Sequence, residues 1–552
     1  MQVTRREFTG GALSFALGAQ LSAAARAQPS PALAHAVDAI RAYAEAHCST
    51  FGLPGLTLGL TLPDGFARTL HFGFANADAR TPITDSTLFQ VGSISKVMTA
   101  ALIHQLAAEG RLRLTDRVSD LMPAVPLPAG NTVQVQHLLD HVAGLSANAP
   151  LFPEGGLWTA YAPGAHWHYS NTGYELLGKL AEQTGGKPLN RLLEERILAP
   201  LGMRGSRGAI VGADRPLYAQ GYEAADPAIP FARGAALAPA AWVDVTFGAG
   251  SVASTSAEMT RFMRSLADAA QGRGGLGLSP PLALALTGRR LPSDTPGMKY
   301  GNGLMHVGHA GRSYLHHTGG MVSFSSSFHL DVASGAGAFA SSTIHYGAEY
   351  RPRLLSRFAA DALTDAMAGK PPPPPPSLDV PVANAAAYVG GYVGPMGAFD
   401  VRVGNPLTIV TRDGSAPLQP WGGDVFRTIH PAFRSFSLKF ERSGRAIAGA
   451  SWGPATFLRQ GSSAPVPRSD PALARLAGRY VNDNPWYGTL IVVERGGKLW
   501  IGTDTPMTRI GDNLWRVGQE SWSPERVSFA HVIDGRPQTL IFSGEKFLRH
   551  DL

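Results

Sequence analysis

Six consecutive prolines, Pro371 to Pro376, interrupt any regular helix or strand at this point of the chain and mark a domain boundary. A proline run adopts the extended polyproline II conformation, so we expect a stiff spacer of about 19 Å at this point. The 552 residues are also too many for one ordinary domain. We therefore predict one domain at residues 28–370, a linker at 371–376 and further domains after it.

The part before the linker mixes helical and strand-like patterns, which predicts an α+β domain. Residues 55–62 and 69–74 are rich in apolar and β-branched positions, as is typical of strands. From Ile94 to Leu106, apolar side chains recur every three or four residues, which predicts a helix that ends before Gly110.

After the linker, aromatic and β-branched residues alternate with glycine turns, which predicts an all-β region. Three pairs of similar residues recur at nearly constant spacing: Tyr392 and Tyr480 are 88 residues apart, Asp424 and Asp512 are 88 apart, and Phe457 and Phe547 are 90 apart. We interpret this as a duplication that forms two small β-barrels or sandwiches, at residues 377–465 and 466–552. One larger β domain with coincidental similarity is the alternative.

Ser93 and Lys96 are the strongest candidates for chemistry, because they lie one turn apart at the start of the predicted helix. A partly buried lysine amine at that distance can take the proton of a serine hydroxyl and activate it as a nucleophile. The free amides at a helix N-terminus also favour developing negative charge. The same spacing recurs at Ser543 and Lys546, where Gly544 and strand-like surroundings predict a surface turn instead.

Two later stretches carry further candidates. Tyr169 precedes Ser170 and Asn171, either of which is a natural N-cap for the helical pattern that follows, so the phenol lies on a loop and is free to face another element. His317 is followed by Thr318 and by a glycine pair that lets a substrate approach the strand closely. Taken singly these triplets are common: Tyr300 heads another Tyr-x-Asn, and His-x-Gly occurs several times.

Together and in this order, Ser93-x-x-Lys96, Tyr169-Ser170-Asn171 and His317-Thr318-Gly319 resemble the three active-site elements of the serine penicillin-recognising hydrolases. That family includes class C β-lactamases, DD-carboxypeptidases, D-aminopeptidases and related esterases. The resemblance extends over about residues 35–365. It implies an antiparallel sheet flanked by helices, with a helical subdomain.

The resemblance also implies roles for these residues. Ser93 would form an acyl-enzyme, with Lys96 and Tyr169 sharing the proton transfers and a cationic neighbour, Lys96 or His317, lowering the pKa of the phenol. The backbone amides of Ser93 and Gly320 would form the oxyanion hole. Asn171 would hold the substrate amide, the strand at Gly319 would accept a close approach of the acyl group, and His317 with Thr318 would face a terminal polar group of the substrate.

The third element begins with His rather than the Lys usual in β-lactamases, and two β-barrels follow the catalytic part. The first feature is more similar to DD-carboxypeptidases and D-aminopeptidases, and the second is most similar to D-aminopeptidases. We therefore expect hydrolysis of D-amino-acid amides or peptides, of the D-aminopeptidase or DD-carboxypeptidase type. An aminopeptidase must bind a free ammonium, and Asp483 or Asp504 from a barrel loop are the candidate carboxylates. A β-lactamase or carboxylesterase with the same serine is one alternative, and a non-catalytic penicillin-binding or interaction protein is another.

The N-terminus predicts export. Arg5 and Arg6, a short apolar run and the small residues 25–27 are typical of a cleaved twin-arginine signal over residues 1–27, which predicts a periplasmic protein. We expect no membrane span after its removal. The formal net charge, +7 for the full sequence, is modest and no basic stripe occurs, so nucleic acid is not an expected partner. With one cysteine, Cys48, and no His-Glu-x-x-His motif, we expect no metal and no cofactor. The oligomeric state is left open.

Overall fold

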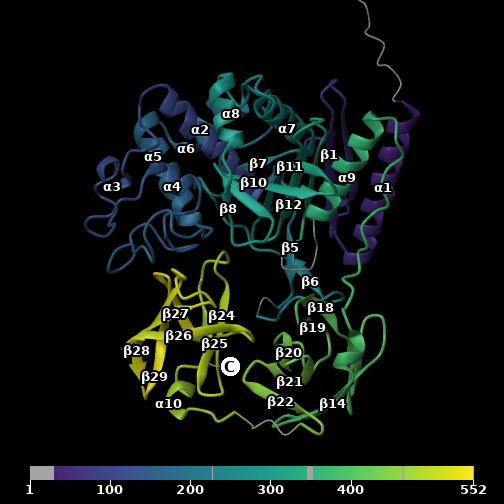
Figure 1. The fold of residues 1–552 in the computed structure, drawn as a ribbon, viewed down its shortest axis with the longest axis vertical. Coiled ribbons are helices and arrows are strands. Elements are labelled where there is room, and N and C mark those ends of the chain that lie inside the picture. The colour runs from purple at the N-terminus through teal and green to yellow at the C-terminus, as the bar shows by residue number, and fades with distance from the viewer. Residues whose placement is uncertain (1–29, 227, 345–351, 463–464, 466, 551–552) are drawn as a thin grey trace, which may run out of the picture.

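The computed structural model describes residues 30–226, 228–344, 352–462, 465 and 467–550 (Figure 1). The predicted signal at residues 1–27 lies outside this range. Among the described residues, none of the helices is both long enough and apolar enough to cross a membrane.

The first part of the chain is built on one antiparallel sheet of nine strands, ordered β3-β2-β1-β13-β12-β11-β10-β9-β8. Every residue of the central strands β1, β12 and β13 is buried, which requires cover on both faces of the sheet. The strands are β1 (Gly55–Thr61), β2 (Ala67–Asn76), β3 (Thr81–Pro82), β8 (Leu291–Pro292), β9 (Met298–Gly301), β10 (Leu304–His309), β11 (Arg312–Gly320), β12 (Ser325–Asp331) and β13 (Gly337–Ser342).

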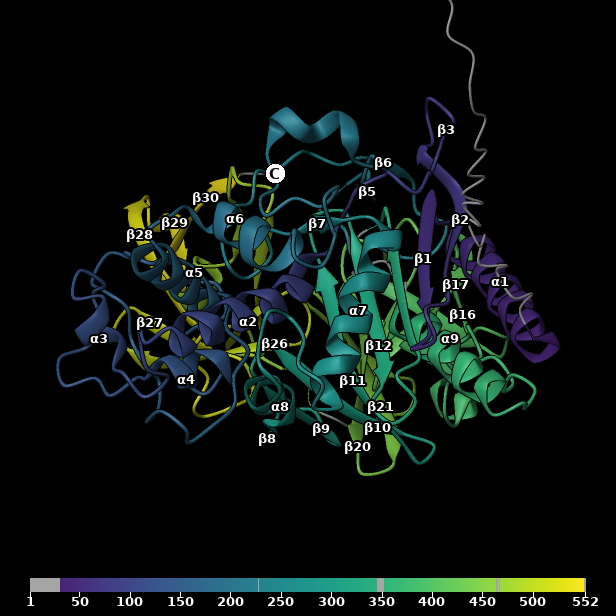
Figure 2. The ribbon, with the colours of Figure 1, turned by 90° about the horizontal axis from the view of Figure 1, so that it is seen from above.

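Helices cover both faces of this sheet, as Figure 2 shows from above. On one face α1 (Pro31–Phe51) packs against α9 (Pro352–Met367) and the alternate side chains of β1. On the other face α7 (Ser256–Ala270) packs on β1 and β13 through a second core, which includes Phe328 and Phe339. The predicted α+β fold is therefore confirmed.

A helical subdomain lies beside the sheet and is centred on α2 (Ser95–Ala108), which is buried from Ser95 to Leu106. The predicted helix therefore forms, with Ser93 in a short 3-10 turn, η1 (Gly92–Ile94), directly before it. Around α2 lie α5 (Asn171–Gly185), α6 (Leu189–Leu193) and α8 (Pro280–Gly288), with α3 (Val118–Leu121) and α4 (Val135–Leu139) completing the subdomain.

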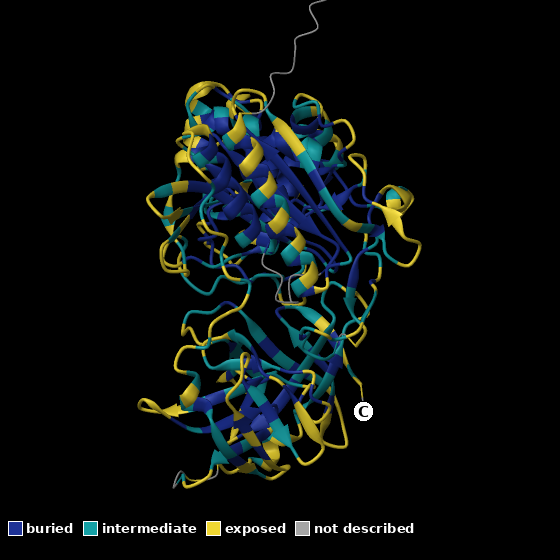
Figure 3. Ribbon diagram, turned by 90° about the vertical axis from the view of Figure 1, so that its right-hand side faces the viewer, coloured by how far each residue is buried: buried dark blue, intermediate teal, exposed yellow. Residues whose placement is uncertain are grey.

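Two all-β domains follow the linker, as predicted, and lie below the catalytic part in Figure 1. In the second, strands β23 to β30 close into a barrel from Gly478 to His550. The first is a sheet ordered β17-β16-β15-β14-β22-β21-β20-β19-β18, whose edge strands β17 and β18 are joined through the single residue Leu418. Its sheet therefore curls almost to closure. Its strands are β14 (Gly390–Gly394), β15 (Gly397–Arg402), β16 (Thr408–Thr411), β17 (Gly414–Pro417), β18 (Gln419–Gly422), β19 (Val425–Arg427), β20 (Leu438–Ser443), β21 (Ala446–Trp452) and β22 (Ala455–Arg459). Figure 3 shows buried strands at the centre of both parts of the molecule and exposed positions on the outside.

The duplication is visible in matching hydrogen bonds. In β14 (Gly390–Gly394) the Tyr392 hydroxyl donates to the carbonyl of Tyr388 over 2.7 Å, and in β23 (Gly478–Val481) the Tyr480 hydroxyl donates to the carbonyl of Leu476 over 2.7 Å. Each tyrosine is fully buried in its own core. Because each strand also pairs with the last strand of its own domain, the two domains share one plan.

Candidate active site

Ser93 and Lys96 lie in hydrogen-bond contact at the base of the site. The Lys96 Nζ is 3.0 Å from the Ser93 Oγ, 2.7 Å from the Asn171 Oδ1 and 2.9 Å from the carbonyl of Ala249. The lysine is fully buried, and this desolvation holds the pKa of its amine well below the ordinary value. A neutral amine at this position can accept the proton of Ser93, which is the role predicted from the spacing.

Tyr169 lies over Lys96, with the ring centroid 4.8 Å from the Nζ. The hydroxyl of Ser170 accepts the amide of Gly173 over 3.0 Å, so Ser170 is the N-cap of α5, one of the two residues predicted for it. This cap fixes the point where the chain leaves the loop and enters the helix. The phenol before it is thereby directed toward Lys96.

His317 lies on β11 near the same group, with its ring centroid 6.4 Å from that of Tyr169. Its Nδ1 donates to the carbonyl of Thr318 over 2.6 Å, so its Nε2 accepts from the Tyr300 hydroxyl over 3.2 Å. Burial and the nearby Lys96 lower the pKa of His317 to about 3. A neutral His317 does not supply the positive charge expected beside Tyr169, and the pKa of Lys96, the other neighbour named for that role, is lowered as well. Of the two residues expected to face a terminal polar group of the substrate, His317 is fully buried against Tyr300 and Thr318 is partly exposed.

The end of β11 passes directly beside the turn that carries Ser93. Gly92 has a φ of +55°, and a Cβ at that position would lie 2.9 Å from the amide nitrogen of Gly320. A Cβ at Gly319 would collide with the carbonyl of Val91. Glycine is therefore required on both elements for Gly320 to approach the nucleophile, which is the arrangement that an oxyanion hole from Ser93 and Gly320 needs.

An aromatic shell surrounds these groups, and the sequence analysis did not select its members. The His141 ring lies 4.3 Å from that of Tyr169, 4.7 Å from that of Tyr300 and 5.1 Å from that of Tyr174. Its Nδ1 accepts the amide of Ser170 over 3.1 Å, while its Nε2 has no hydrogen-bond partner. Burial holds the pKa of His141 well below the ordinary value, so this ring is neutral. Tyr300 carries a signal in the sequence, its Tyr-x-Asn triplet, but that triplet is too common to select it.

The second barrel also reaches the site, through the loop at residues 482–488 between β23 and β24 (Thr489–Arg495). Trp486 packs against Phe247, with ring centroids 5.8 Å apart. A cavity of about 60 Å³ lies between this loop and α5, next to the residue that holds Lys96; its lining includes Asn148, Asn171, Glu175, Asn484, Trp486 and Tyr487.

Glu175 is the acidic group of this small cavity. Burial, with the neighbouring carboxylate of Glu545 as a second cause, raises the pKa of Glu175 to about 7. Glu545 is the first residue of β30 (Glu545–His550), directly after the turn Ser543-Gly544 that follows β29 (Arg536–Phe542), where the second Ser-x-x-Lys spacing predicted a surface turn. That turn faces the catalytic domain, since Ser543 is buried there.

Asp483 and Asp504, the two carboxylates expected to bind a substrate ammonium, lie in different parts of the second barrel. Asp483 lies in the loop that reaches the site, but its side chain is exposed and Asn484, not Asp483, lines the small cavity. Asp504 lies near Arg495, whose guanidinium donates to the carbonyl of Gly453 over 2.6 Å at the junction of the two β-domains. The barrel carboxylate that faces α5 is Glu545.

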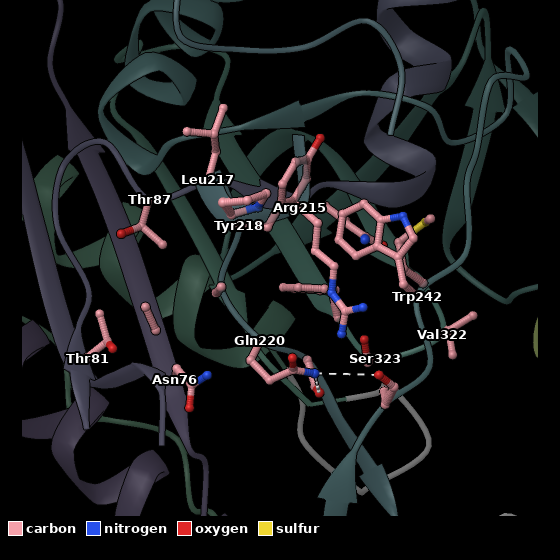
Figure 4. A pocket seen from close by; sticks show the side chains of 18 of the residues that line it. Asn76, Thr81, Thr87, Arg215, Leu217, Tyr218, Gln220, Trp242, Val322 and Ser323 are labelled. Atoms are coloured by element: carbon pink, nitrogen blue, oxygen red, sulfur yellow. Dashed lines mark hydrogen bonds between the residues drawn. The ribbon is translucent and has the colours of Figure 1, made fainter. Parts of the chain in front are cut away.

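A larger cavity of about 760 Å³ opens where the chain continues from Gly320 into residues 321–324 (Figure 4). The Arg215 guanidinium lies 5.8 Å from the ring centroid of Trp242, and the indole nitrogen of Trp242 donates to Asp244 over 2.7 Å. Figure 4 shows the guanidinium pointing into the space between Trp242 and Gln220. Val243 lines both this cavity and the small one, so the two adjoin each other.

Comparison with known proteins places this site in a family. The Beta-lactamase family model matches residues 37–389. A "Beta-lactamase" of Pseudomonas fluorescens is 34% identical over 196 residues, which is 33% of this chain and 54% of that relative. A "Penicillin-binding protein 4" of Amycolatopsis lactamdurans is 29% identical over 28% of this chain and 44% of its own length. The chain thus spans about half the length of the curated relatives that it matches.

A solved structure supports the fold. The octameric penicillin-binding protein homologue from Pyrococcus abyssi superposes with a TM-score of 0.55 at 21% identity, covering 77% of this chain and 100% of that one. Because the family model covers most of the chain, and because an activated serine lies at the junction of α2 and β11, the resemblance is confirmed: this chain belongs to the Beta-lactamase family of serine hydrolases.

Proposed function

We propose that this serine hydrolase cleaves D-amino-acid amides or peptides with a free amino terminus. One observation carries the proposal: the loop of the second barrel closes one side of the small cavity that Asn171 and Glu175 line, and the charge of Glu545 acts on Glu175 from the same barrel. Two carboxylates beside a small aromatic cavity fit the ammonium group that an aminopeptidase must bind. The lowered pKa of His317 favours the same substrate class, since His317 then offers no positive charge to a substrate carboxylate.

The reaction follows from the contacts of the site. Lys96 takes the proton of Ser93 as the Oγ attacks the substrate carbonyl, and the amides of Ser93 and Gly320 receive the developing oxyanion. The proton then passes by way of Tyr169 to the leaving amine, whose bond to the carbonyl carbon breaks. A water molecule hydrolyses the acyl-enzyme by the same proton path in reverse.

The relatives named beta-lactamase make hydrolysis of β-lactams the second candidate, since the same serine can open the strained ring. Carboxylesterase activity is a further candidate, because it requires the same serine nucleophile and no additional group. A protein that binds penicillin without turnover is the candidate from another class. For all of these we propose a periplasmic location, based on the twin-arginine pattern of residues 1–27.

A panel of three substrates separates the candidates: D-alanine p-nitroanilide, a chromogenic cephalosporin and p-nitrophenyl acetate. We expect the anilide to give the highest kcat/KM, and Ser93→Ala to abolish turnover of all three while the protein stays folded. At pH 8, where Glu175 is mostly ionised, Glu175→Gln should raise KM for the anilide by about 10-fold, since it removes that charge from the ammonium site, and leave the uncharged ester within about 2-fold. Preferred turnover of the cephalosporin would contradict the proposal, as would an L-alanine anilide cleaved equally well.

A further inference from the structure

A carboxylate of the second barrel, Glu525, is bound by the catalytic domain rather than by its own domain alone. Its Oε1 accepts the amide of Ala147 over 2.7 Å and lies 3.0 Å from the Nε2 of His168. Its Oε2 accepts the hydroxyl of Ser146 over 2.9 Å and that of Ser543, from the barrel, over 2.6 Å. The side chain is 13% exposed.

These four contacts keep the carboxylate charged. Burial by itself would raise the pKa of Glu525, but the hydrogen bonds from His168, Ser543 and Ala147 outweigh it, so the pKa lies below its ordinary value. Hydrogen bonds to an ionised carboxylate are stronger than those between neutral groups. Glu525 therefore holds the catalytic domain more firmly than a neutral contact would.

The segment that Glu525 holds is bonded directly to the start of α5. The carbonyl of Ala147 accepts the amide of Asn171 over 2.8 Å, and the carbonyl of Ser146 accepts the Ser170 hydroxyl over 2.7 Å. Asn171 in turn binds Lys96, which contacts the nucleophile. A short chain of hydrogen bonds thus runs from the barrel to the catalytic serine.

We propose that Glu525 is a positioning residue for catalysis: through Ala147 and His168 it holds Asn171, Lys96 and Tyr169 in the geometry that acylation needs. His168 is covalently next to Tyr169, so its contact with Glu525 restrains the phenol, while the contact with Ala147 restrains Asn171. In this role a domain outside the catalytic fold supports the proton transfer itself. The inference requires only the serine hydrolase chemistry and holds whichever substrate the enzyme uses.

Other contacts keep the barrel docked when the carboxylate is removed, so its role can be tested separately. The Trp522 ring stacks on His166 at 4.6 Å and an interplanar angle of 6°. The indole nitrogen of Trp158 donates to the carbonyl of Pro524 over 2.8 Å. Neither contact involves the Glu525 side chain.

The experiment measures the acylation rate constant of the full chain with p-nitrophenyl acetate, per titrated active site, for wild type, Glu525→Ala and Glu525→Gln. Since a displacement of about 1 Å in a catalytic group can cost about 100-fold, we expect Glu525→Ala to acylate 10- to about 100-fold more slowly at saturating ester. Glu525→Gln should recover most of the rate, because its carbonyl can still accept from Ala147 and its amide can donate to the serines. Hydrogen exchange at residues 144–172 should accelerate in Glu525→Ala.

Glu494 of the same barrel provides the matched control. It is 8% exposed and is bound by Ser469 and by the amides of Asp470 and Gly497, all in its own domain. We expect Glu494→Ala to lower the melting temperature without slowing acylation or loosening residues 144–172. Two results would overturn the proposal: unchanged hydrogen exchange in residues 144–172 of Glu525→Ala, or equal losses of rate in Glu494→Ala and Glu525→Ala.

Discussion

The two β-domains share one plan but contact the catalytic domain differently. In the first, Pro395 and Met396 alone connect β14 to β15 (Gly397–Arg402), whereas in the second residues 482–488 connect the equivalent strands. The longer loop carries Trp486 to the active site. The first domain instead docks through Gln419, whose side chain exchanges hydrogen bonds of 2.6 and 3.0 Å with the backbone of Arg233.

This difference shows how a duplicated domain acquires a role in catalysis without changing its core. The barrel core needs its inward tyrosine and phenylalanines, and both copies keep them. The turns between strands are free to lengthen, because they lie outside the core. Among the described residues, the second copy lines the small cavity beside Asn171, whereas the first copy lines neither that cavity nor the larger one next to it.

The sharpest test of this comparison shortens the loop. Replacing residues 482–488 by the two-residue Pro-Met connection of the first domain removes Trp486 and Tyr487 from the site. Since burial of one aromatic side chain contributes about 2 to 3 kcal/mol, we expect kcat/KM for D-alanine p-nitroanilide to fall by about 100-fold. Acylation by p-nitrophenyl acetate should change less than about 3-fold. Equal losses for both substrates would show that the loop supports the fold rather than the pocket.

A second test uses the stability of the protein against pH. The folded-state pKa of Glu175, about 7, lies above that of an unfolded carboxyl, so this group stabilises the fold below pH 4 and loses that contribution as pH rises through 7. We expect Glu175→Gln to raise the free energy of unfolding at pH 8 by about 2 kcal/mol, discounted for partial solvent access, and by little at pH 4. Urea unfolding at both pH values measures the difference.

A double substitution measures how much Glu545 of the second barrel contributes to the free-energy change caused by Glu175→Gln. Because Glu545 contributes to the raised pKa, Glu545→Gln should reduce the benefit of Glu175→Gln at pH 8. If the two substitutions were strictly additive, the carboxylates would not sense each other and the ammonium site would have to be assigned to other groups.

A third test addresses the large cavity, which no β-domain lines. Arg215 is exposed and its guanidinium points into that cavity. We therefore expect Arg215→Ala to raise KM by about 5-fold for a peptide that bears a carboxylate. An uncharged amide of the same length is the control and should be unaffected. A similar loss for both peptides would assign the effect to packing on Trp242.

The smallest effect on activity is expected from the docking site of the first domain. Gln419→Ala removes two hydrogen bonds to Arg233 and should cost about 1 to 2 kcal/mol of stability. Turnover per folded molecule should stay as in wild type. A loss of activity would mean that both copies, not one, are coupled to the site.

The sequence predicted the fold class and the convergence of Ser93, Lys96 and Tyr169, because these depend on local spacing and on ordered motifs. It did not predict the protonation state of His317, which depends on burial that only the packed sheet creates. Tyr300 and Glu525 were also missed. Glu525 belongs to no local pattern, and its contacts in the catalytic domain lie 378 and 357 positions away. Tyr300 heads a Tyr-x-Asn triplet that is too common to single it out, and its contact with His317 depends on the pairing of β9, β10 and β11.

The contact between Glu525 and Ala147 joins residues 378 positions apart, so the positioning that we propose begins only after residue 525 has been added to the chain. A ribosome has synthesised the nucleophile long before it reaches the residue that holds its neighbours. We expect a prematurely terminated product to carry the serine but to react sluggishly, so that incomplete molecules are kept from hydrolysing whatever they meet.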